Sequence, residues 1–154
     1  YRSEYNNDKN GFIPTTYQFT EYPVRGAKMY LSGGADLSST AKDISIFANM
    51  LLKKGTYNGV KVLGSRSVEM MKMKQTEHDW WDSFVGFALI ITNENGAAKG
   101  PSSLGSFGWG GFYDTYCWVD PEYKLVAVLM LQMYPTNEFK IHERFASITY
   151  GVID

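Results

Sequence analysis

The fold of this chain is decided by the stretch Gly105-Ser106-Phe107-Gly108-Trp109-Gly110-Gly111-Phe112-Tyr113-Asp114-Thr115-Tyr116-Cys117-Trp118-Val119-Asp120-Pro121. Small residues lead into the glycine pair Gly110-Gly111, and an aromatic segment then closes on an Asp-Pro turn. Glycine lets a ligand approach the backbone closely, where a strand N–H group serves as a hydrogen-bond donor. The stretch therefore predicts a β-hairpin, which is either the wall of a binding site or a glycine-rich hairpin without chemistry.

Three strands are predicted in and after this stretch, at residues 104–109, 112–119 and 124–132. The Asp-Pro-Glu sequence at 120–122 predicts the turn between the last two, because proline suits the second position of a β-turn. Residues 125–131 are apolar on both faces. We therefore expect a central strand that is covered on each side.

An amphipathic helix is predicted to begin after Thr40, with Ser39 as the alternative cap. Asp43 stands three residues after Thr40 and completes a capping box. The apolar residues that follow at helical spacing are Ile44, Phe47, Ala48 and Leu51. Lys53 and Lys54 are placed in the last turn, and Gly55 is placed at the C′ position.

Shorter elements are predicted around this helix. Asn58-Gly59 is typical of a tight hairpin turn. Ser65 is expected to cap a helix that continues through Val68, Met71 and Met73. Residues 84–92 are expected to form a strand and residues 93–96 a turn.

A final helix is expected to begin near Thr136 or Asn137, with one apolar stripe made of Ile141, Phe145, Ile148 and Val152. Residues 1–30 are rich in turn formers and are expected to be an irregular leader. Helices before and after an antiparallel meander indicate the α+β class, with helices packed on the sheet. We expect a single domain over residues 1–154.

Composition narrows the possible functions. At 154 residues, with 44% hydrophobic and 20% charged residues, the chain is long enough for one domain with a core. The net charge of −1 provides no basic stripe for nucleic acid. No apolar run approaches the roughly 20 residues of a membrane-spanning helix. The single cysteine, Cys117, excludes an internal disulfide. The chain starts without a signal peptide, although its first residue need not be the natural start.

Trp109-Gly110-Gly111, with Thr115-Tyr116 and residues 118–121 (Trp-Val-Asp-Pro) after it, resembles the third motif of the β-lactamase-like serine hydrolases. These include class C β-lactamases, family VIII carboxylesterases and D-Ala-D-Ala carboxypeptidases. Residues 33–43 are similar to the glycine-rich loop and Ser-Thr-Ala-x-Asp helix start of that family. Residues 51–63 resemble its next helix, turn and hairpin. The order and spacing of these motifs extend the resemblance over nearly the whole chain.

The resemblance implies a partial β-lactamase/transpeptidase-like fold and the C-terminal part of such an enzyme. Neither the family's Ser-x-x-Lys nucleophile motif nor its Tyr-x-Asn motif is matched in context. The sequence Ser-Thr-Ala-Lys at 39–42 satisfies the first pattern literally but is interpreted as a helix cap. Tyr5-Asn6-Asn7 satisfies the second and is interpreted as a surface turn. The chain alone is therefore expected to be inactive.

The same resemblance assigns the site residues. Trp109, Gly110 and Gly111 line the substrate site together with the loop Gly33-Gly34, and the backbone N–H of Phe112 supplies an oxyanion-hole donor. Asp114 stands where many relatives carry a small residue. Trp109 cannot pair with a carboxylate as a lysine would, so neutral acyl substrates are expected rather than anionic β-lactams. No cofactor is implied.

Other candidate sites are weaker. His78 and His142 lack partners at zinc-ligand spacing, so no metal site is predicted. Cys117 lies in an apolar strand and is expected to be an inert thiol. The Asp-Trp-Trp-Asp sequence at 79–82 either rims a substrate cleft or packs a helix on a strand.

Two alternatives to a serine hydrolase remain open: a non-catalytic ligand-binding module of the same fold, and a structural domain. The expected partner of the parent enzyme is a small acyl or peptide-like substrate. A homodimer through the edge of the strand at 125–131 is also predicted, because unpaired strand edges attract other chains. The chain does not reveal its localisation, although the resemblance suits an exported parent.

Overall fold

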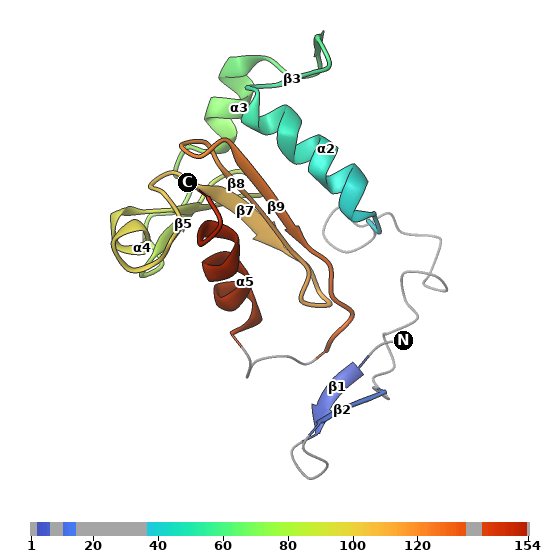
Figure 1. Cartoon of the computed structure of the whole chain (residues 1–154). Coiled ribbons are helices and arrows are strands. Elements are labelled where there is room, and N and C mark those ends of the chain that lie inside the picture. The colour runs from blue at the N-terminus through green and yellow to red at the C-terminus, as the bar shows by residue number, and fades with distance from the viewer. Residues whose placement is uncertain (1–2, 7–10, 15–36, 135–139, 154) are drawn as a thin grey trace.

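The computed structural model describes residues 3–6, 11–14, 37–134 and 140–153 of the 154-residue chain. Its centre is a five-stranded antiparallel sheet in the order β5-β6-β7-β8-β9. Its strands are β5 (Ser83–Val85), β6 (Ile90–Thr92), β7 (Phe107–Gly110), β8 (Tyr116–Asp120) and β9 (Leu125–Leu129). Helix α2 (Ala41–Leu52) packs on one face and helix α5 (Ile141–Tyr150) on the other (Figure 1). This architecture confirms the predicted α+β class.

The hydrophobic core lies between α2 and the sheet. Ala48, Met50 and Leu51 of α2 are buried in one cluster with Phe107 of β7 and Val119 of β8. Alternate residues of a strand face opposite sides, so β8 also has a second face, which packs against α5. Full burial of each large apolar side chain stabilises the fold by about 1.5–3 kcal/mol.

Helix α2 begins as its sequence predicts. Thr40 is the N-cap, and its Oγ1 accepts a hydrogen bond of 3.1 Å from the backbone N–H of Asp43. The C-terminus differs from the prediction by one residue, because Lys53 is the C-cap and Lys54 occupies C′ with φ +52°. Gly55 follows with φ +94°, where a Cβ would collide with the carbonyl oxygen of Leu63.

The Asn58-Gly59 turn is confirmed. It joins β3 (Thr56–Tyr57) to β4 (Val60–Lys61), and both turn residues have positive φ. Helix α3 (Ser65–Met71) begins one residue earlier than a Ser65 cap would place it, because Gly64 is the N-cap. Met73 lies outside the helix.

The single strand predicted at 84–92 is wrong. Two strands, β5 and β6, form instead, because a turn closes between them through a 2.8 Å hydrogen bond from the Gly86 N–H to the Leu89 carbonyl. Ala88 adopts φ +54° in that turn. The turn predicted at 93–96 is also wrong: the Asn93 side chain caps helix α4 (Glu94–Lys99) by accepting from the Gly96 N–H at 3.0 Å.

The three strands of the meander are confirmed with shorter bounds, and a turn follows Asp120 as expected. Strand β9 is covered by a helix on each face, but it is an edge strand of the described sheet rather than a central one. The predicted homodimer through this edge stays a prediction.

The termini also differ from expectation. The leader is not irregular throughout, because β1 (Ser3–Asn6) and β2 (Gly11–Pro14) form a two-stranded sheet that places Tyr5 opposite Phe12. Aromatic residues of this kind favour strands. The predicted starts of the last helix, residues 136 and 137, lie outside the described residues; α5 itself begins at Ile141, after Lys140 with φ +47°.

The apolar stripe predicted for α5 is partly wrong. Ile148 and Val152 are exposed, and Val152 lies beyond the helix end. The side chains that make ring contacts with β8 are those of His142, Phe145 and Tyr150. Aromatic contacts with β8 therefore help to hold this face of the helix on the sheet.

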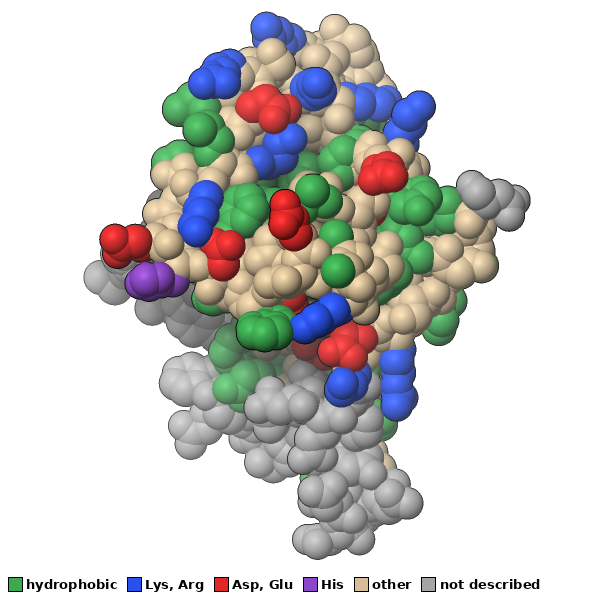
Figure 2. All heavy atoms as spheres, turned by 90° about the vertical axis from the view of Figure 1, so that its left-hand side faces the viewer, with side chains coloured by type: hydrophobic (Ala, Val, Ile, Leu, Met, Phe, Trp, Pro, Cys, Tyr) green, Lys and Arg blue, Asp and Glu red, His purple; other side chains and the backbone are tan. Residues whose placement is uncertain are grey.

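The surface near β5 and α4 carries charges of both signs. Figure 2 shows acidic and basic side chains beside one another, with apolar groups between them. Across the described ranges, no helix combines the length and apolar character that crossing a bilayer requires.

Candidate active-site wall

The glycine-rich stretch folds into the β7–β8 hairpin. Trp109 pairs with Cys117 and Gly110 with Tyr116. The N–H of Gly111 then donates to the Thr115 carbonyl at 2.8 Å, and the N–H of Asp114 donates to the Gly111 carbonyl at 3.0 Å. Residues 112–114 thus form a tight loop, which we call the 111–115 turn.

Asp114 closes this turn in the left-handed conformation, with φ +66°. Glycine is the usual residue in this conformation, and aspartate is one of the few others that tolerate it. This accounts for a non-glycine residue at a position where a small one was expected from the resemblance.

The two glycines of the motif have different roles. A Cβ on Gly111 would collide with Oγ1 of Thr115, so any other residue there would force the Thr115 side chain to move. A Cβ on Gly110 would have its nearest neighbour at 3.7 Å, which is ordinary contact. Glycine at position 110 is therefore not needed for packing.

A cavity of about 320 Å³ lies between α2 and the sheet and reaches this hairpin. That volume is within the range of small-molecule sites. Its wall consists of Leu37, Ile44, Phe47, Ala48, Leu51, Ala88, Leu89, Phe107, Gly108, Trp109, Gly110, Gly111, Thr115, Tyr116, Cys117, Val119, Val128 and Met130. None of these residues carries a charge, so the cavity suits a neutral, mainly apolar group.

The structure brings together three of the predicted site residues. Trp109, Gly110 and Gly111 all line the cavity, and the Trp109 side chain is 48% exposed at its rim. Phe112 is next to the cavity rather than in its wall, and its ring stacks on Tyr134 at 4.5 Å between centroids. The loop Gly33-Gly34 lies outside the described residues.

One edge of β7 extends beyond its neighbour here. Strand β6 pairs with β7 only at Phe107 and Gly108. Beyond Gly108, β7 continues past Ile90, the first residue of β6. From Trp109 onward, this edge of β7 therefore has no pairing partner in β6.

Titratable groups of the cavity wall are protonated at neutral pH. Burial raises the pKa of the Cys117 thiol to about 11, so the thiolate needed for nucleophilic attack is scarce. Burial also raises the pKa of Tyr116, with smaller contributions from Cys117 and Asp82. This agrees with the prediction of an inert cysteine.

On the opposite face of β8, sequence reasoning missed a buried polar network, because Asp120 was considered only as a turn residue. Its carboxylate is fully buried and accepts hydrogen bonds from the Tyr150 hydroxyl at 2.6 Å and the Ser103 N–H at 3.0 Å. Burial alone would raise the pKa of Asp120, but these hydrogen bonds lower it below its usual value. The network fixes the end of β8 distant from the 111–115 turn.

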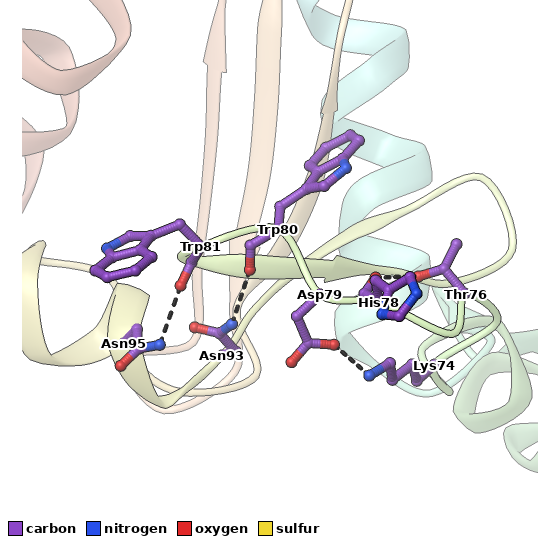
Figure 3. A network of polar contacts seen from close by, with 8 residues as sticks. All are labelled: Lys74, Thr76, His78, Asp79, Trp80, Trp81, Asn93 and Asn95. Atoms are coloured by element: carbon purple, nitrogen blue, oxygen red, sulfur yellow. Dashed lines mark hydrogen bonds and ion pairs between the residues drawn. The ribbon is translucent and has the colours of Figure 1, made fainter.

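The tryptophan pair at 80–81 lies in the loop before β5 and is not among the residues that line the cavity. Both side chains are more than half exposed, and Lys99 Nζ lies 4.4 Å from the Trp81 ring centroid. Figure 3 shows the side chains of Asn93 and Asn95 holding the carbonyl groups of Trp80 and Trp81, with an ion pair between Lys74 and Asp79 nearby.

The literal motif matches are not assembled into a site. Ser39 precedes the Thr40 cap and is exposed, as is Lys42. Tyr5 and Asn6 belong to strand β1 rather than to a turn, and Asn7 lies outside the described residues. His78 lies in the loop of Figure 3, whereas His142 contacts Asp114.

Comparison with known proteins identifies relatives of this architecture. Protein Rv1367c of Mycobacterium tuberculosis (strain ATCC 25618 / H37Rv) is 34% identical over 120 residues, which cover 69% of this chain and 30% of that protein. Simvastatin synthase (LovD) from Aspergillus terreus matches with a TM-score of 0.76 at 15% identity, over 97% of this chain and 42% of its own. EstCE1, a hydrolase with promiscuous acyltransferase activity, matches with a TM-score of 0.70 at 18% identity, over 96% of this chain and 38% of its own.

This chain thus spans less than half the length of each of these relatives. The two structural matches show that the fold is the β-lactamase fold. The family model described as Beta-lactamase matches residues 2–148, nearly the whole chain. The chain therefore belongs to the Beta-lactamase family.

Proposed function

We propose that this chain supplies one wall of the acyl-transfer site of a longer serine hydrolase, whose nucleophile lies outside residues 1–154. One observation carries the proposal. Trp109, Gly110 and Gly111 line an uncharged cavity at the point where the 111–115 turn begins. Membership of the beta-lactamase family supports the reaction class.

The proposed role of the turn is electrostatic. Acyl transfer passes through a tetrahedral oxyanion, and fixed N–H donors that face it lower the barrier. In this proposal, the backbone N–H of Phe112 is one such donor. The paired hairpin behind it keeps the donor in place at no further cost during the reaction. Loss of one such donor lowers kcat by roughly 10²–10³.

The cavity wall favours neutral substrates. Its described lining contains no lysine or arginine to pair with a carboxylate, and Trp109 offers only an apolar face and one N–H donor. Short, uncharged acyl esters fit this lining better than anionic β-lactams or free peptide termini. An uncharged ester is therefore the substrate with which to test the proposal.

Exposure argues against Ser39 as a nucleophile with Lys42 as its base. A lysine that serves as a base needs a depressed pKa, which burial or a neighbouring cation provides. Lys42 is exposed, and so is Ser39. The thiol of Cys117 is protonated.

Ester hydrolysis tests the proposal directly. The intact gene product should hydrolyse p-nitrophenyl butyrate, and the isolated chain should not. Phe112→Pro deletes the proposed donor. Proline suits the second position of a β-turn, which Phe112 occupies between Gly111 and Asp114. A folded Phe112→Pro gene product with full kcat would eliminate the donor role.

A binding module of the same fold is the second candidate. The cavity is favoured for this role because its described wall is apolar and has no activated nucleophile. An intact gene product that binds the ester without turning it over would favour this candidate.

A further inference from the structure

The 111–115 turn is held from the C-terminal side of the chain as well as by its own hairpin. The N–H of Met133 donates to the Tyr113 carbonyl at 3.2 Å, and Tyr134 stacks on Phe112. Helix α5 adds a third contact through His142. The residues after β9 therefore help to set the position of the turn.

His142 contacts one residue of the turn twice. Its Nε2 lies 3.0 Å from the backbone carbonyl oxygen of Asp114 and 3.1 Å from Oδ1 of the same residue. Both oxygens are acceptors, so the contacts require a hydrogen on Nε2, in either the neutral Nε2–H tautomer or the imidazolium. One N–H group is shared between the backbone and the side chain of Asp114.

The ring of His142 is also oriented by the sheet. It stacks on Tyr116 with 4.7 Å between centroids and 17° between planes. Tyr116 is the β8 residue paired with Gly110 of the wall. His142 thus contacts the hairpin at its last strand pair and at its turn.

Asp114 is the residue that most needs such support. Its φ of +66° is a conformation in which glycine is favoured over any residue with a Cβ. A donor that contacts both the carbonyl oxygen and Oδ1 of Asp114 favours this one conformation over the others that an aspartate adopts more readily.

We propose that His142 is a positioning residue for the candidate site. Through Asp114 it keeps the 111–115 turn in the conformation that aims the Phe112 N–H. The part of this proposal that concerns catalysis rests on the proposed function of the turn. The coupling of His142 to the turn does not depend on that function.

Amide hydrogen exchange of Gly111 tests this coupling in the 154-residue chain without any substrate, because the Gly111 N–H bonds to Thr115 across the turn. His142→Phe keeps an aromatic ring for Tyr116 but has no donor. Exchange should become faster by roughly three- to tenfold, the effect of one hydrogen bond. His142→Gln restores an N–H donor without the ring and should recover most of the protection.

Glu143→Gln is the matched control, because Glu143 is the next residue of α5 and its side chain is exposed. A Gly111 exchange rate that is unchanged in His142→Phe would overturn the proposal. So would equal loss of protection in His142→Phe and His142→Gln, because the N–H donor that Gln restores would then not account for the protection.

A double-mutant cycle locates the effect at Asp114. Asp114→Gly favours positive φ by itself, so adding His142→Phe in that background should change Gly111 exchange less than twofold. If His142→Phe changed Gly111 exchange as much in the Asp114→Gly variant as in the chain that retains Asp114, the result would contradict the mechanism.

Kinetics of the intact gene product test whether His142 affects catalysis. His142→Phe should lower kcat with little change in KM, because the oxyanion donor acts mainly in the transition state. Unchanged kcat, with altered Gly111 exchange, would overturn the positioning role. An intact gene product with no activity would remove the proposed function while the exchange result would still stand.

Discussion

The hydroxyl group of Tyr150 donates a 2.6 Å hydrogen bond to Oδ2 of Asp120, which joins the end of α5 to the end of β8. The indole Nε1 of Trp118 donates to the same hydroxyl at 3.2 Å. Asp120 is fully buried, and its other oxygen accepts from the N–H of Glu122 at 3.0 Å. This network fixes α5 on the sheet, and α5 in turn carries His142 to the 111–115 turn.

Tyr150→Phe should destabilise the chain by about 1.5–3 kcal/mol, the usual contribution of a hydrogen bond to a charged group. Equilibrium urea unfolding measures the change. Tyr123→Phe is the control, because Tyr123 is 49% exposed and contacts Tyr150 only edge to face. Equal effects of the two substitutions would contradict the assignment.

The same pair predicts the pH dependence of stability at both extremes. The pKa of Asp120 in the folded chain lies below its ordinary value of 3.8. The stability that its carboxylate contributes is therefore present above pH 3.8 and is lost as the pH falls through the pKa of the folded state. Burial and the bond to Asp120 raise the pKa of Tyr150 from 10.0 to about 12. Its contribution is present below pH 10.0 and is lost as pH rises to about 12.

Urea unfolding across a pH series tests both the acid and the alkaline loss of stability. Tyr150→Phe should lack the alkaline loss, and its acid loss should begin at higher pH, because Asp120 loses a hydrogen-bond donor. A variant with the wild-type pH profile would show that the pair does not control stability at either extreme.

Thr40→Ala should destabilise the chain by about 0.5–2 kcal/mol, because it removes the cap of α2. Ser39→Ala should leave the urea midpoint nearly unchanged, since Thr40 is the residue that accepts from Asp43. A larger loss for Ser39 than for Thr40 would reverse the assignment.

Local signals in the sequence predicted most of the regular elements. The Thr40 cap with its apolar spacing predicted α2, and Asn58-Gly59 predicted its hairpin, because both are decided within a few residues. The turn before Leu89 was missed because Ala88 adopts positive φ without being a turn residue. Asn93 was recognised as a turn former but not as a helix cap.

The site was predictable only in part. Trp109, Gly110 and Gly111 were found from a local motif and a resemblance, and they do line the cavity. The cavity itself forms between α2 and strands more than fifty residues away, which no local pattern specifies. The contact of His142 with Asp114 spans 28 residues and depends on how α5 packs.

Gly111→Ala and Gly110→Ala form a matched pair that separates the two glycines. The first should destabilise the chain by about 1–3 kcal/mol, because its Cβ collides with Thr115. The second should be tolerated, because its Cβ has ordinary contacts. Thermal unfolding compares them, and similar losses in both would contradict the turn geometry.

Covalent labelling by a fluorophosphonate probe tests the central claim most directly. With the intact gene product, peptide mapping should find one labelled serine outside residues 1–154, and the isolated chain should remain unlabelled. A labelled serine within these residues, Ser39 above all, would contradict the account, as would an intact gene product that the probe does not label.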